Sequence, residues 1–226
     1  LNEVAILVRA IYQTREFEER FLKVGLGYRV LGGTKFYERA EVKDAVAYLR
    51  IINQKYDDLA LERVIGSPRR GIGESTLNQL YNFGSKKKLC LEDSIKKNLE
   101  TNSLKPKMKT SLTLLTKMID KWRLDSKTNK HYDLLKIILD ESGYSEMLKN
   151  KKDLENENRL ENIKELLRAM HDYDNLQSFL EHVALATSND KEWEGEKINL
   201  MTMHAAKGLE FDVVFLPGWE EGLFPH

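Results

Sequence analysis

The sequence has a single cysteine, Cys90, among its 226 residues. One cysteine cannot form a disulfide within the chain, and it cannot supply the several thiolates of a cysteine-built metal site. The five histidines show no spacing typical of metal ligands. We therefore expect no metal site in this chain. We also expect a reducing, cytoplasmic location, because disulfides are typical of oxidising compartments.

Long apolar runs are also missing from the sequence. No segment approaches the roughly 18–20 apolar residues that a membrane-spanning helix needs, and no signal-peptide pattern is visible at the start. We therefore expect no membrane partner. Hydrophobic residues make up 41% and charged residues 32% of the chain, which is typical of a globular protein with a substantial core. The length allows one large domain or two small ones.

A nucleotide-binding loop of the form Gly-x-x-x-x-Gly-Lys-Ser/Thr is missing as well. Lys207 and Gly208 stand in the reverse order, and residues 32–35, Gly-Gly-Thr-Lys, lack the spacing. Such a loop holds nucleotide phosphates through its backbone N–H groups and its lysine. This chain by itself is therefore expected to be unable to hydrolyse ATP.

Charge is balanced overall but unevenly distributed. The formal net charge is zero, yet residues 84–130 contain thirteen Lys or Arg against five Asp or Glu. Residues 181–226 contain three against nine. A basic region of this kind attracts phosphate backbones, and a solvated lysine-rich surface explains it equally well. Both interpretations stay open.

The two ends of the chain show the pattern of an α/β fold. Residues 3–8 and 28–31 are predicted strands on either side of a helix over 14–24, and strand, helix, strand is typical of a parallel sheet. Residues 198–201 and 213–216 are predicted as two further buried strands. Ligands of such sheets bind beyond the carboxyl ends of the strands. The polar loop after residue 201 is therefore the first candidate for chemistry.

The middle of the chain is helical from Glu41 onward. Apolar residues recur there at helical spacing, and Asp57 or Asp58 is a candidate cap for a helix through Ile65. The irregular spacing of these apolar stripes favours a globular bundle. The predicted fold class is α/β with a large all-α insertion, in which both chain ends form one parallel sheet.

A glycine-containing turn lies between two predicted helices at residues 67–77. Gly71-Ile72-Gly73 precedes a helix start at 74–76, where exposed backbone N–H groups suit a phosphate. Arg69 and Arg70 add positive charge. The pattern has the outline of a helix–hairpin–helix element, which binds the duplex backbone without reading sequence. An ordinary helix–helix turn that needs glycine for positive φ is the alternative.

Several motifs resemble one family. Residues 201–211, Met-Thr-Met-His-Ala-Ala-Lys-Gly-Leu-Glu-Phe, with Glu-Glu-Gly-Leu-Phe-Pro at 220–225, resemble motif V of the UvrD/PcrA/Rep group of superfamily 1 DNA helicases. Residues 7–15 are similar to that family's Tyr-Arg-x-Asn-x-Gln-Ser-Arg motif, although valine replaces the tyrosine. Residues 32–44 and 70–73 also match in order. The resemblance covers essentially the whole chain but only part of a family member.

The resemblance implies a domain organisation and a function. Residues 1–38 and 195–226 are implied to be two parts of the second RecA-like helicase domain, and 39–194 its inserted helical accessory subdomain. The chain, which starts without Met, is expected to be a fragment of an ATP-dependent helicase that moves 3′ to 5′ on DNA and serves repair. ATP and Mg²⁺ are the implied cofactors of the full-length protein. Single-stranded DNA, duplex DNA and repair proteins are the implied partners.

The resemblance also implies three groups of site residues. Those expected at single-stranded DNA are Thr202, His204 and Arg9. Those expected at the nucleotide are Lys207, Gly208 and Glu210, the last near the ribose. Those expected at duplex DNA are Lys43, Arg50, Arg70, Gly71, Ile72, Gly73 and Thr76. A loop that touches both strand and nucleotide is able to couple hydrolysis to a step along the strand.

Two other function classes stay open. The chain is alternatively part of a recombination helicase–nuclease, or a non-catalytic module that binds DNA or a protein. The Gly71–Gly73 turn and the 220–225 tail favour the repair group over the nuclease group. Steeply salt-dependent binding to duplex would distinguish a DNA-binding module from a protein-binding one.

Overall fold

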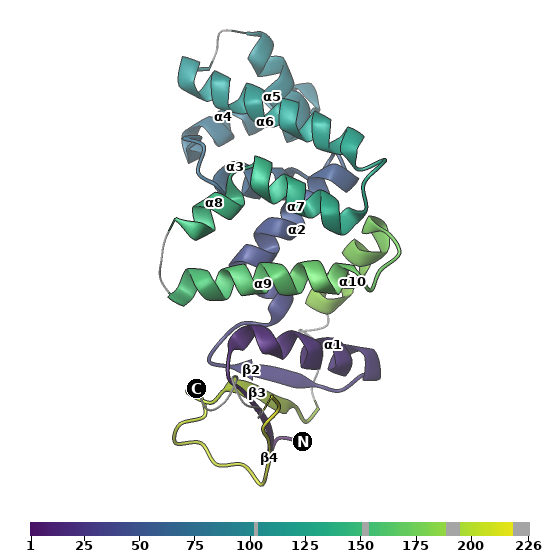
Figure 1. Cartoon of the computed structure of the whole chain (residues 1–226). Coiled ribbons are helices and arrows are strands. Elements are labelled where there is room, and N and C mark those ends of the chain that lie inside the picture. Colours follow the sequence, from purple (N-terminus) through teal and green to yellow (C-terminus); the bar gives the residue numbers. More distant parts are fainter. Residues whose placement is uncertain (102–103, 151–153, 189–194, 219–226) are drawn as a thin grey trace. The chain divides into compact units, whose positions relative to one another are not determined.

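The computed structural model describes residues 1–101, 104–150, 154–188 and 195–218. The chain divides into two compact units. The first unit comprises Leu1–Val42, Asp153–Leu166 and Glu181–His226, and the second comprises Lys43–Lys152 and Leu167–Leu180. Figure 1 shows the strands and helices along the chain.

The first unit contains a four-stranded sheet in the order β2-β3-β1-β4, with every pairing parallel. Its strands are β1 (Val4–Val8), β2 (Tyr28–Leu31), β3 (Ile198–Thr202) and β4 (Val213–Phe215). Strands from the two ends of the chain therefore alternate across the sheet. The prediction of one parallel sheet built by both chain ends is confirmed, and so is the α/β class with a helical insertion.

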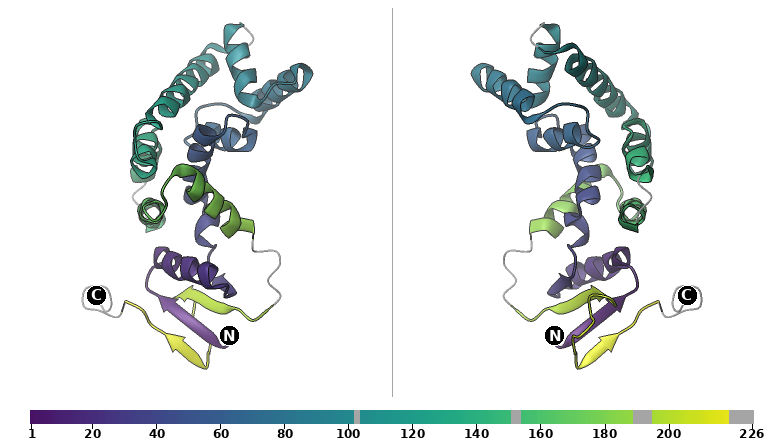
Figure 2. Two further views of the ribbon diagram at one scale, coloured as in Figure 1. Left: turned by 90° about the vertical axis from the view of Figure 1, so that its right-hand side faces the viewer. Right: turned by 90° about the vertical axis from the view of Figure 1, so that its left-hand side faces the viewer.

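Helix α1 (Thr14–Val24) lies along the sheet, as Figures 1 and 2 show. Phe17 and Phe21 are four residues apart and share one helix face. They pack with Tyr28, Ile198 and Leu200 in the core of this unit. The helix ends at Gly25, whose φ of 68° is the left-handed conformation that glycine adopts most readily. Two short 3-10 helices, η1 (Ile11–Gln13) and η2 (Phe36–Glu38), flank α1 and β2 in sequence.

Strand β4 differs from its prediction as a buried strand. Val213, Val214 and Phe215 are 45%, 45% and 55% exposed. Among the described strands, β4 pairs only with β1 and forms an edge of the sheet. An alternating or continuous apolar sequence predicts a strand. The strand is buried only where other elements of the fold cover its faces.

The central helices match the predicted bundle. They are α2 (Ala40–Asn53), α3 (Asp58–Gly66), α4 (Glu74–Lys87), α5 (Leu91–Glu100), α6 (Pro106–Asp125), α7 (His131–Glu141), α8 (Tyr144–Lys149), α9 (Leu154–Met170) and α10 (Leu176–Ser188). The division between the units falls within α2, α9 and α10. No helix in the described part of the chain has the length and apolar character needed to cross a membrane.

The apolar stripe of α6 lies in the core of the second unit. In α6, Leu112, Leu115, Ile119 and Trp122 are each at most 2% exposed. The rings of Tyr48 and Trp122 pack edge to face with centroids 5.9 Å apart. Asp57 is the cap of α3, since its Oδ1 accepts a hydrogen bond of 3.0 Å from the Ala60 N–H.

A buried carboxylate joins three helices of the second unit. Glu92 on α5 accepts two 2.7 Å hydrogen bonds from the Arg123 guanidinium on α6, and Arg123 also donates to the Ile51 carbonyl on α2 at 2.7 Å. Lys96 lies 3.0 Å from the same carboxylate. Burial opposes ionisation of Glu92, but its bonds with Arg123 and Lys96 outweigh burial and hold the carboxyl pKa below its ordinary 4.5.

This pKa shift predicts a pH-dependent contribution to stability. A carboxyl with a lowered folded-state pKa stabilises the fold above its unfolded-state pKa, and the contribution disappears as pH falls through the folded-state pKa. We expect Glu92→Gln to lower the free energy of unfolding at pH 7. The difference from wild type should shrink as pH falls below about 4.5. Urea denaturation of both proteins across that range measures it, and a pH-independent difference would contradict it.

Candidate nucleic-acid and nucleotide interface

The carboxyl ends of β1 and β3 bring the predicted single-strand residues together. Val8 pairs with Thr202 in register, and the Met203 N–H donates a 3.1 Å hydrogen bond to the Val8 carbonyl. Arg9 follows β1 directly, and His204 follows β3 by two residues; both are exposed. Residues nearly 200 positions apart in sequence therefore lie at one edge of the sheet.

Thr202 organises the loop that follows β3. Its carbonyl accepts a 3.1 Å hydrogen bond from the Ala206 N–H, and its hydroxyl oxygen accepts one of 3.3 Å from the Ala205 N–H. A threonine hydroxyl used in this way shapes a tight turn. The hydroxyl hydrogen is still able to donate to a ligand, because the hydroxyl acts here as an acceptor.

The predicted nucleotide residues lie further along the same loop. The side chains of Lys207 and Glu210 are exposed, and Gly208 has a φ of 83° that favours glycine. The loop backbone is held by its own turns, including a 3.0 Å bond from the Leu209 N–H to the Ala206 carbonyl. Internal backbone bonds thus shape the loop and leave an ammonium and a carboxylate at the surface.

Gly32 lies against the loop after β3, a contact that no sequence pattern indicates. It ends β2, which pairs with β3 up to Leu31 and Met201, and it has a φ of 74°. A Cβ atom placed on Gly32 would lie 2.8 Å from the Ala205 Cβ, closer than real side chains approach. The Gly32-Gly33 pair was visible in the sequence, but its partner in the loop after β3 was not.

Valine stands at position 8, where the motif that residues 7–15 resemble has tyrosine. Val8 is 1% exposed, so its side chain lies inside the sheet unit and offers no surface to a ligand. Tyr12 in η1 is half-buried. At this edge of the sheet, Arg9 is therefore the exposed side chain of the motif.

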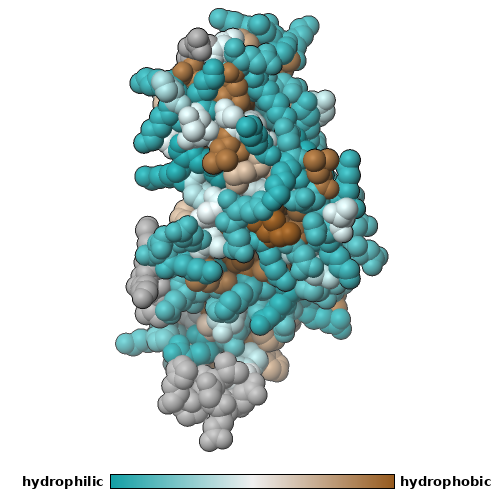
Figure 3. All heavy atoms as spheres, turned by 45° about the horizontal axis from the view of Figure 1, so that its top comes forward, coloured by the Kyte–Doolittle hydropathy of each residue, from teal (hydrophilic) through white to brown (hydrophobic). Residues whose placement is uncertain are grey.

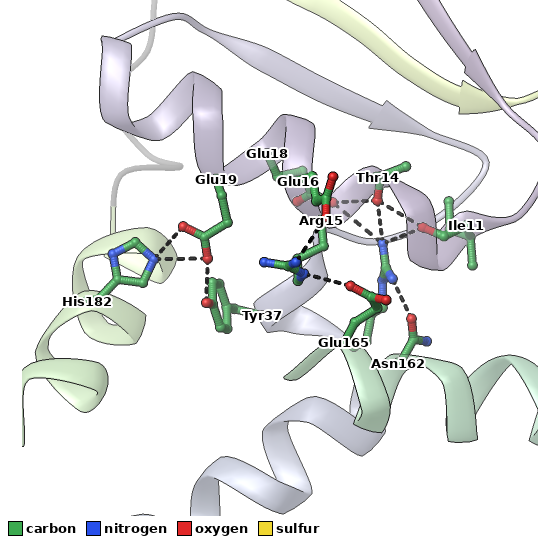
Figure 4. Close-up of polar contacts among 11 residues, drawn as sticks. Ile11, Thr14, Arg15, Glu16, Glu18, Glu19, Tyr37, Asn162, Glu165 and His182 are labelled. Carbon is green, nitrogen blue, oxygen red and sulfur yellow. Dashed lines mark hydrogen bonds and ion pairs between the residues drawn. The ribbon is translucent and has the colours of Figure 1, made fainter. Parts of the chain in front are cut away.

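A buried polar cluster fixes the turn after Arg9 (Figure 4). The Arg39 guanidinium donates to the Ile11 carbonyl at 3.1 Å and to the Thr14 hydroxyl at 2.7 Å. It also donates to the Asn162 side-chain oxygen on α9 at 2.6 Å and lies 3.5 Å from Glu18. Arg39 is 5% exposed and Glu18 is 3% exposed. The turn that carries Arg9 is thus bonded to α1 and α9.

The pKa values of Glu18 and Glu19 in this cluster are shifted in opposite directions. Burial raises the pKa of Glu18, although bonds from Thr14, from the Phe36 N–H and from Arg39 favour its ionised form. Burial also opposes ionisation of Glu19. There, bonds from His182 and Tyr37 outweigh burial and hold the pKa below its usual value. Figure 4 shows both carboxylates on α1, with Arg15 bonded to Glu165 at 2.9 Å between them.

In the second unit, α2 anchors the glycine-containing turn. Asp44 accepts a 2.9 Å hydrogen bond from the Ser67 hydroxyl, and the Tyr48 hydroxyl donates to the Ser67 carbonyl at 2.8 Å. Lys43 is next to Asp44 in sequence and is exposed. The structure therefore brings the start of α2 and the turn together.

Two predicted duplex residues have structural contacts of their own. Arg70 donates to the Val64 carbonyl, to the Pro68 carbonyl at 2.9 Å and to the Tyr48 hydroxyl at 2.8 Å. The Thr76 side chain is buried, and its hydroxyl lies 3.4 Å from the Met108 sulfur on α6. The hydrogen bonds of Arg70 therefore stabilise the turn. The Thr76 hydroxyl points toward α6 and not toward solvent.

The tip of the turn is open. Gly71 and Gly73 are exposed, and a Cβ added to either would meet no atom within 4 Å. Ile72 between them is half-buried. Gly73 is the N-cap of α4 and offers no side chain to the first amides of that helix. Arg50 is exposed near the end of α2, where its Nε lies 2.6 Å from Asp57.

No group of three or more His, Cys, Asp or Glu side chains is placed to hold a metal ion in the ranges that the structure describes. The exposed residues among those predicted to contact DNA or nucleotide lie in two separate places, one in each unit. One is the edge formed by Arg9 and the loop after β3 in the first unit. The other is the glycine-containing turn in the second unit.

Comparison with known proteins places these features in a family. The whole chain, residues 1–226, matches the UvrD-like helicase C-terminal domain. DNA helicase II of Rickettsia typhi is 45% identical over 226 residues, which cover 99% of this chain and 34% of that protein. The ATP-dependent DNA helicase PcrA of Bacillus subtilis is 38% identical over 239 residues, covering 100% of this chain and 32% of that protein. The chain spans about a third of the length of these curated relatives. It belongs to the family of UvrD-like helicase C-terminal domains.

Proposed function

We propose that this chain is the DNA-contacting and nucleotide-coupling part of an ATP-dependent DNA helicase. The protein that contains it moves 3′ to 5′ along single-stranded DNA and acts in DNA repair in the cytoplasm. The three segments 1–38, 39–194 and 195–226 are its domain pieces, as the family resemblance implies. The observation that carries the proposal is the pairing of Val8 with Thr202, which sets Arg9 beside the loop after β3.

That edge suits a single strand of DNA. Arg9 offers a cation to a phosphate, while His204 offers a ring and a polar nitrogen to a base or a phosphate. Thr202 keeps a hydroxyl hydrogen to donate. Because these groups extend from backbone that the sheet and the Arg39 cluster hold in place, little ordering is needed when a strand binds.

The same loop suits a nucleotide at its other end. The exposed Glu210 carboxylate is a fitting acceptor for ribose hydroxyls, and Lys207 contributes positive charge. ATP with Mg²⁺ supplies phosphoryl transfer when bound. The phosphate-binding loop that such transfer needs is not in this sequence, so we propose that the chain alone does not hydrolyse ATP.

The glycine-containing turn suits the backbone of duplex DNA. Gly71 and Gly73 allow close approach because no side chain projects from them, and Lys43 lies on the adjoining helix. Contacts of backbone amides and lysines with phosphates are independent of sequence. This is what a protein that separates many different sequences requires.

The test is binding of this chain to fluorescent single strand, blunt duplex and duplex with a 3′ tail, at about 50 and about 200 mM salt. We expect the single strand to bind through Arg9 and the loop after β3, and the duplex to bind through the glycine-containing turn. Arg9→Ala with His204→Ala should weaken single-strand binding about tenfold, or about 1.4 kcal/mol. Gly73→Val should weaken duplex binding, because its side chain would cover the start of α4.

Matched variants control for non-specific effects. Lys23→Ala removes an exposed cation elsewhere on the first unit, and Gly66→Val adds the same side chain at another glycine with open space around it. Neither should change binding. If the folded wild-type chain binds none of the three DNAs at low salt, the DNA assignment is rejected.

A further inference from the structure

A cavity in the second unit shares no residue with the sites described above. Its volume is about 620 Å³, which is within the usual range of pockets that hold small ligands. Residues between 126 and 134, at the beginning of α7, line one wall, and residues 171–176, in the turn between α9 and α10, line the other. In Figure 1 both segments lie at the right of the ribbon.

Hydrogen bonds hold both walls of the cavity in place. The buried His131 begins α7, and its Nε2 is hydrogen-bonded to the Met170 carbonyl oxygen at the end of α9, 2.7 Å away. In the turn, the Asn175 Oδ1 accepts a 3.0 Å hydrogen bond from the Ser178 N–H at the start of α10. The cavity is therefore formed before a ligand enters, and little ordering is needed when one binds.

Two aromatic rings stack on each other in the cavity lining. The Tyr132 and His171 rings have centroids 3.7 Å apart and planes 23° apart. Tyr132 is half-buried and comes from α7, whereas His171 is exposed and comes from the turn after α9. Tyr132 covers one face of the His171 ring, and the exposure of His171 leaves the other face to a ligand. Flat rings of this kind are surfaces on which nucleobases stack.

A cation and a carboxylate complete the lining. Lys130 and Asp174 are exposed, and neither side chain has an ion pair or hydrogen bond among the residues that the structure describes. The Lys130 Nζ lies 5.9 Å from the centroid of the Tyr132 ring, so a positive charge stands beside the stacked pair. An ammonium binds a phosphate, and a carboxylate accepts hydrogen bonds from ribose hydroxyls. Base, ribose and phosphate each have a suitable partner here.

The composition of the lining favours a single small polar ligand. Lys130 is the one lysine or arginine among the lining residues, and Asp174 balances its charge, whereas a phosphate backbone requires several cations. The face of the molecule in Figure 3 is mainly hydrophilic, with hydrophobic side chains in separate areas. The cavity is similarly polar, since Leu134 and Leu176 are the aliphatic members of its lining. It therefore suits a nucleotide better than a DNA strand or an apolar protein surface.

We infer that this cavity binds a ribonucleoside monophosphate. The base stacks on His171, the ribose hydroxyls donate to Asp174, and the phosphate accepts from Lys130. This inference goes beyond the proposed function, because the cavity contains none of the residues assigned to DNA or to the nucleotide of the first unit.

The test is calorimetric titration of the whole chain with AMP, at up to about 1 mM, the upper end of usual affinities of enzymes for small substrates. His171→Ala and Lys130→Gln should each weaken AMP binding about tenfold, through loss of stacking and of a charged hydrogen bond. His171→Phe keeps a stacking ring and should keep the affinity. Wild type should prefer AMP over its 2′-deoxy form about tenfold, and Asp174→Asn should bind both equally.

Matched controls remove exposed charges next to the lining residues. Lys127→Gln and Asp172→Asn should leave AMP binding unchanged, and circular dichroism establishes that every variant is folded. If the folded wild-type chain does not bind AMP at about 1 mM, the inference is overturned. Equal losses in Lys130→Gln and Lys207→Gln/Glu210→Gln would also overturn it, because AMP would then bind at the loop after β3.

Two further results separate this inference from its neighbours. A short adenosine RNA should compete with AMP less well than free AMP does, and stronger competition by the RNA would assign the cavity to a nucleic-acid strand and overturn the inference. A chain that binds AMP in the cavity but binds no DNA would support the inference and reject the proposed function.

Discussion

Arg39→Met is expected to lower the free energy of unfolding by about 3–5 kcal/mol, the usual loss when one partner of a buried ion pair is removed. Methionine keeps most of the apolar volume but makes none of the guanidinium's bonds to Ile11, Thr14 and Asn162. Glu18 would then remain buried without its cation. Chemical denaturation followed by circular dichroism measures the loss.

The control for this variant is Arg20→Met. Arg20 lies on α1 in the same unit but is exposed, so its replacement should change stability by no more than about 0.5 kcal/mol. The double variant Glu18→Met/Arg39→Met should be less destabilised than Arg39→Met, since it leaves no unpaired buried charge. If Arg39→Met lowers the free energy of unfolding by less than about 1 kcal/mol, the polar cluster around Arg39 does not stabilise the fold as predicted.

The effect of Arg39→Met should also depend on pH. Burial already raises the pKa of Glu18 above 4.5 in the wild type, and removal of Arg39 raises it further. As pH falls from 7 toward 4.5, the folded variant takes up a proton before the unfolded chain does, so its stability recovers relative to wild type. A difference that stays constant over this range would mean that Glu18 is not the source of the loss.

Gly32→Ala is expected to weaken single-strand binding by about tenfold, or about 1.4 kcal/mol. The new Cβ would overlap the Ala205 Cβ, 2.8 Å away. Relief of that overlap would displace the loop that carries Thr202 and His204. The left-handed backbone at Gly32 adds a further cost of about 1–2 kcal/mol for any L side chain. Fluorescence anisotropy with a labelled oligonucleotide measures the affinity.

Two variants separate the overlap from the backbone strain. Gly25→Ala has a similar φ of 68° but would meet no atom within 4 Å, so it should lower stability without weakening DNA binding. Gly32→Ala/Ala205→Gly removes the overlap and should restore affinity. If the double variant binds as poorly as Gly32→Ala, the contact between β2 and the loop does not position the strand-binding residues.

The sequence by itself determined the local elements of this protein. The helix over Thr14–Val24 and the strand over Tyr28–Leu31 have the bounds that their patterns predict. The sequence also predicted a cap at Asp57 or Asp58 and a helix start at 74–76, and the structure has the cap at Asp57 and the helix start at Glu74. These features depend on residues within one or two turns of each other, where spacing and capping chemistry decide the conformation. The motif in the loop after β3 was identified by its resemblance to a helicase motif.

Only the tertiary structure decided which of these elements meet. Val8 is paired with Thr202, Arg39 is bonded to Asn162, and Thr76 lies against Met108. The tertiary structure also leaves β4 exposed despite its apolar sequence, and it directs the Thr76 hydroxyl toward α6. Such contacts join residues far apart in the chain, and many alternative partners satisfy the same local pattern. Their selection depends on packing and on pairing buried polar groups throughout the fold, because a buried charge or hydroxyl without a partner destabilises it.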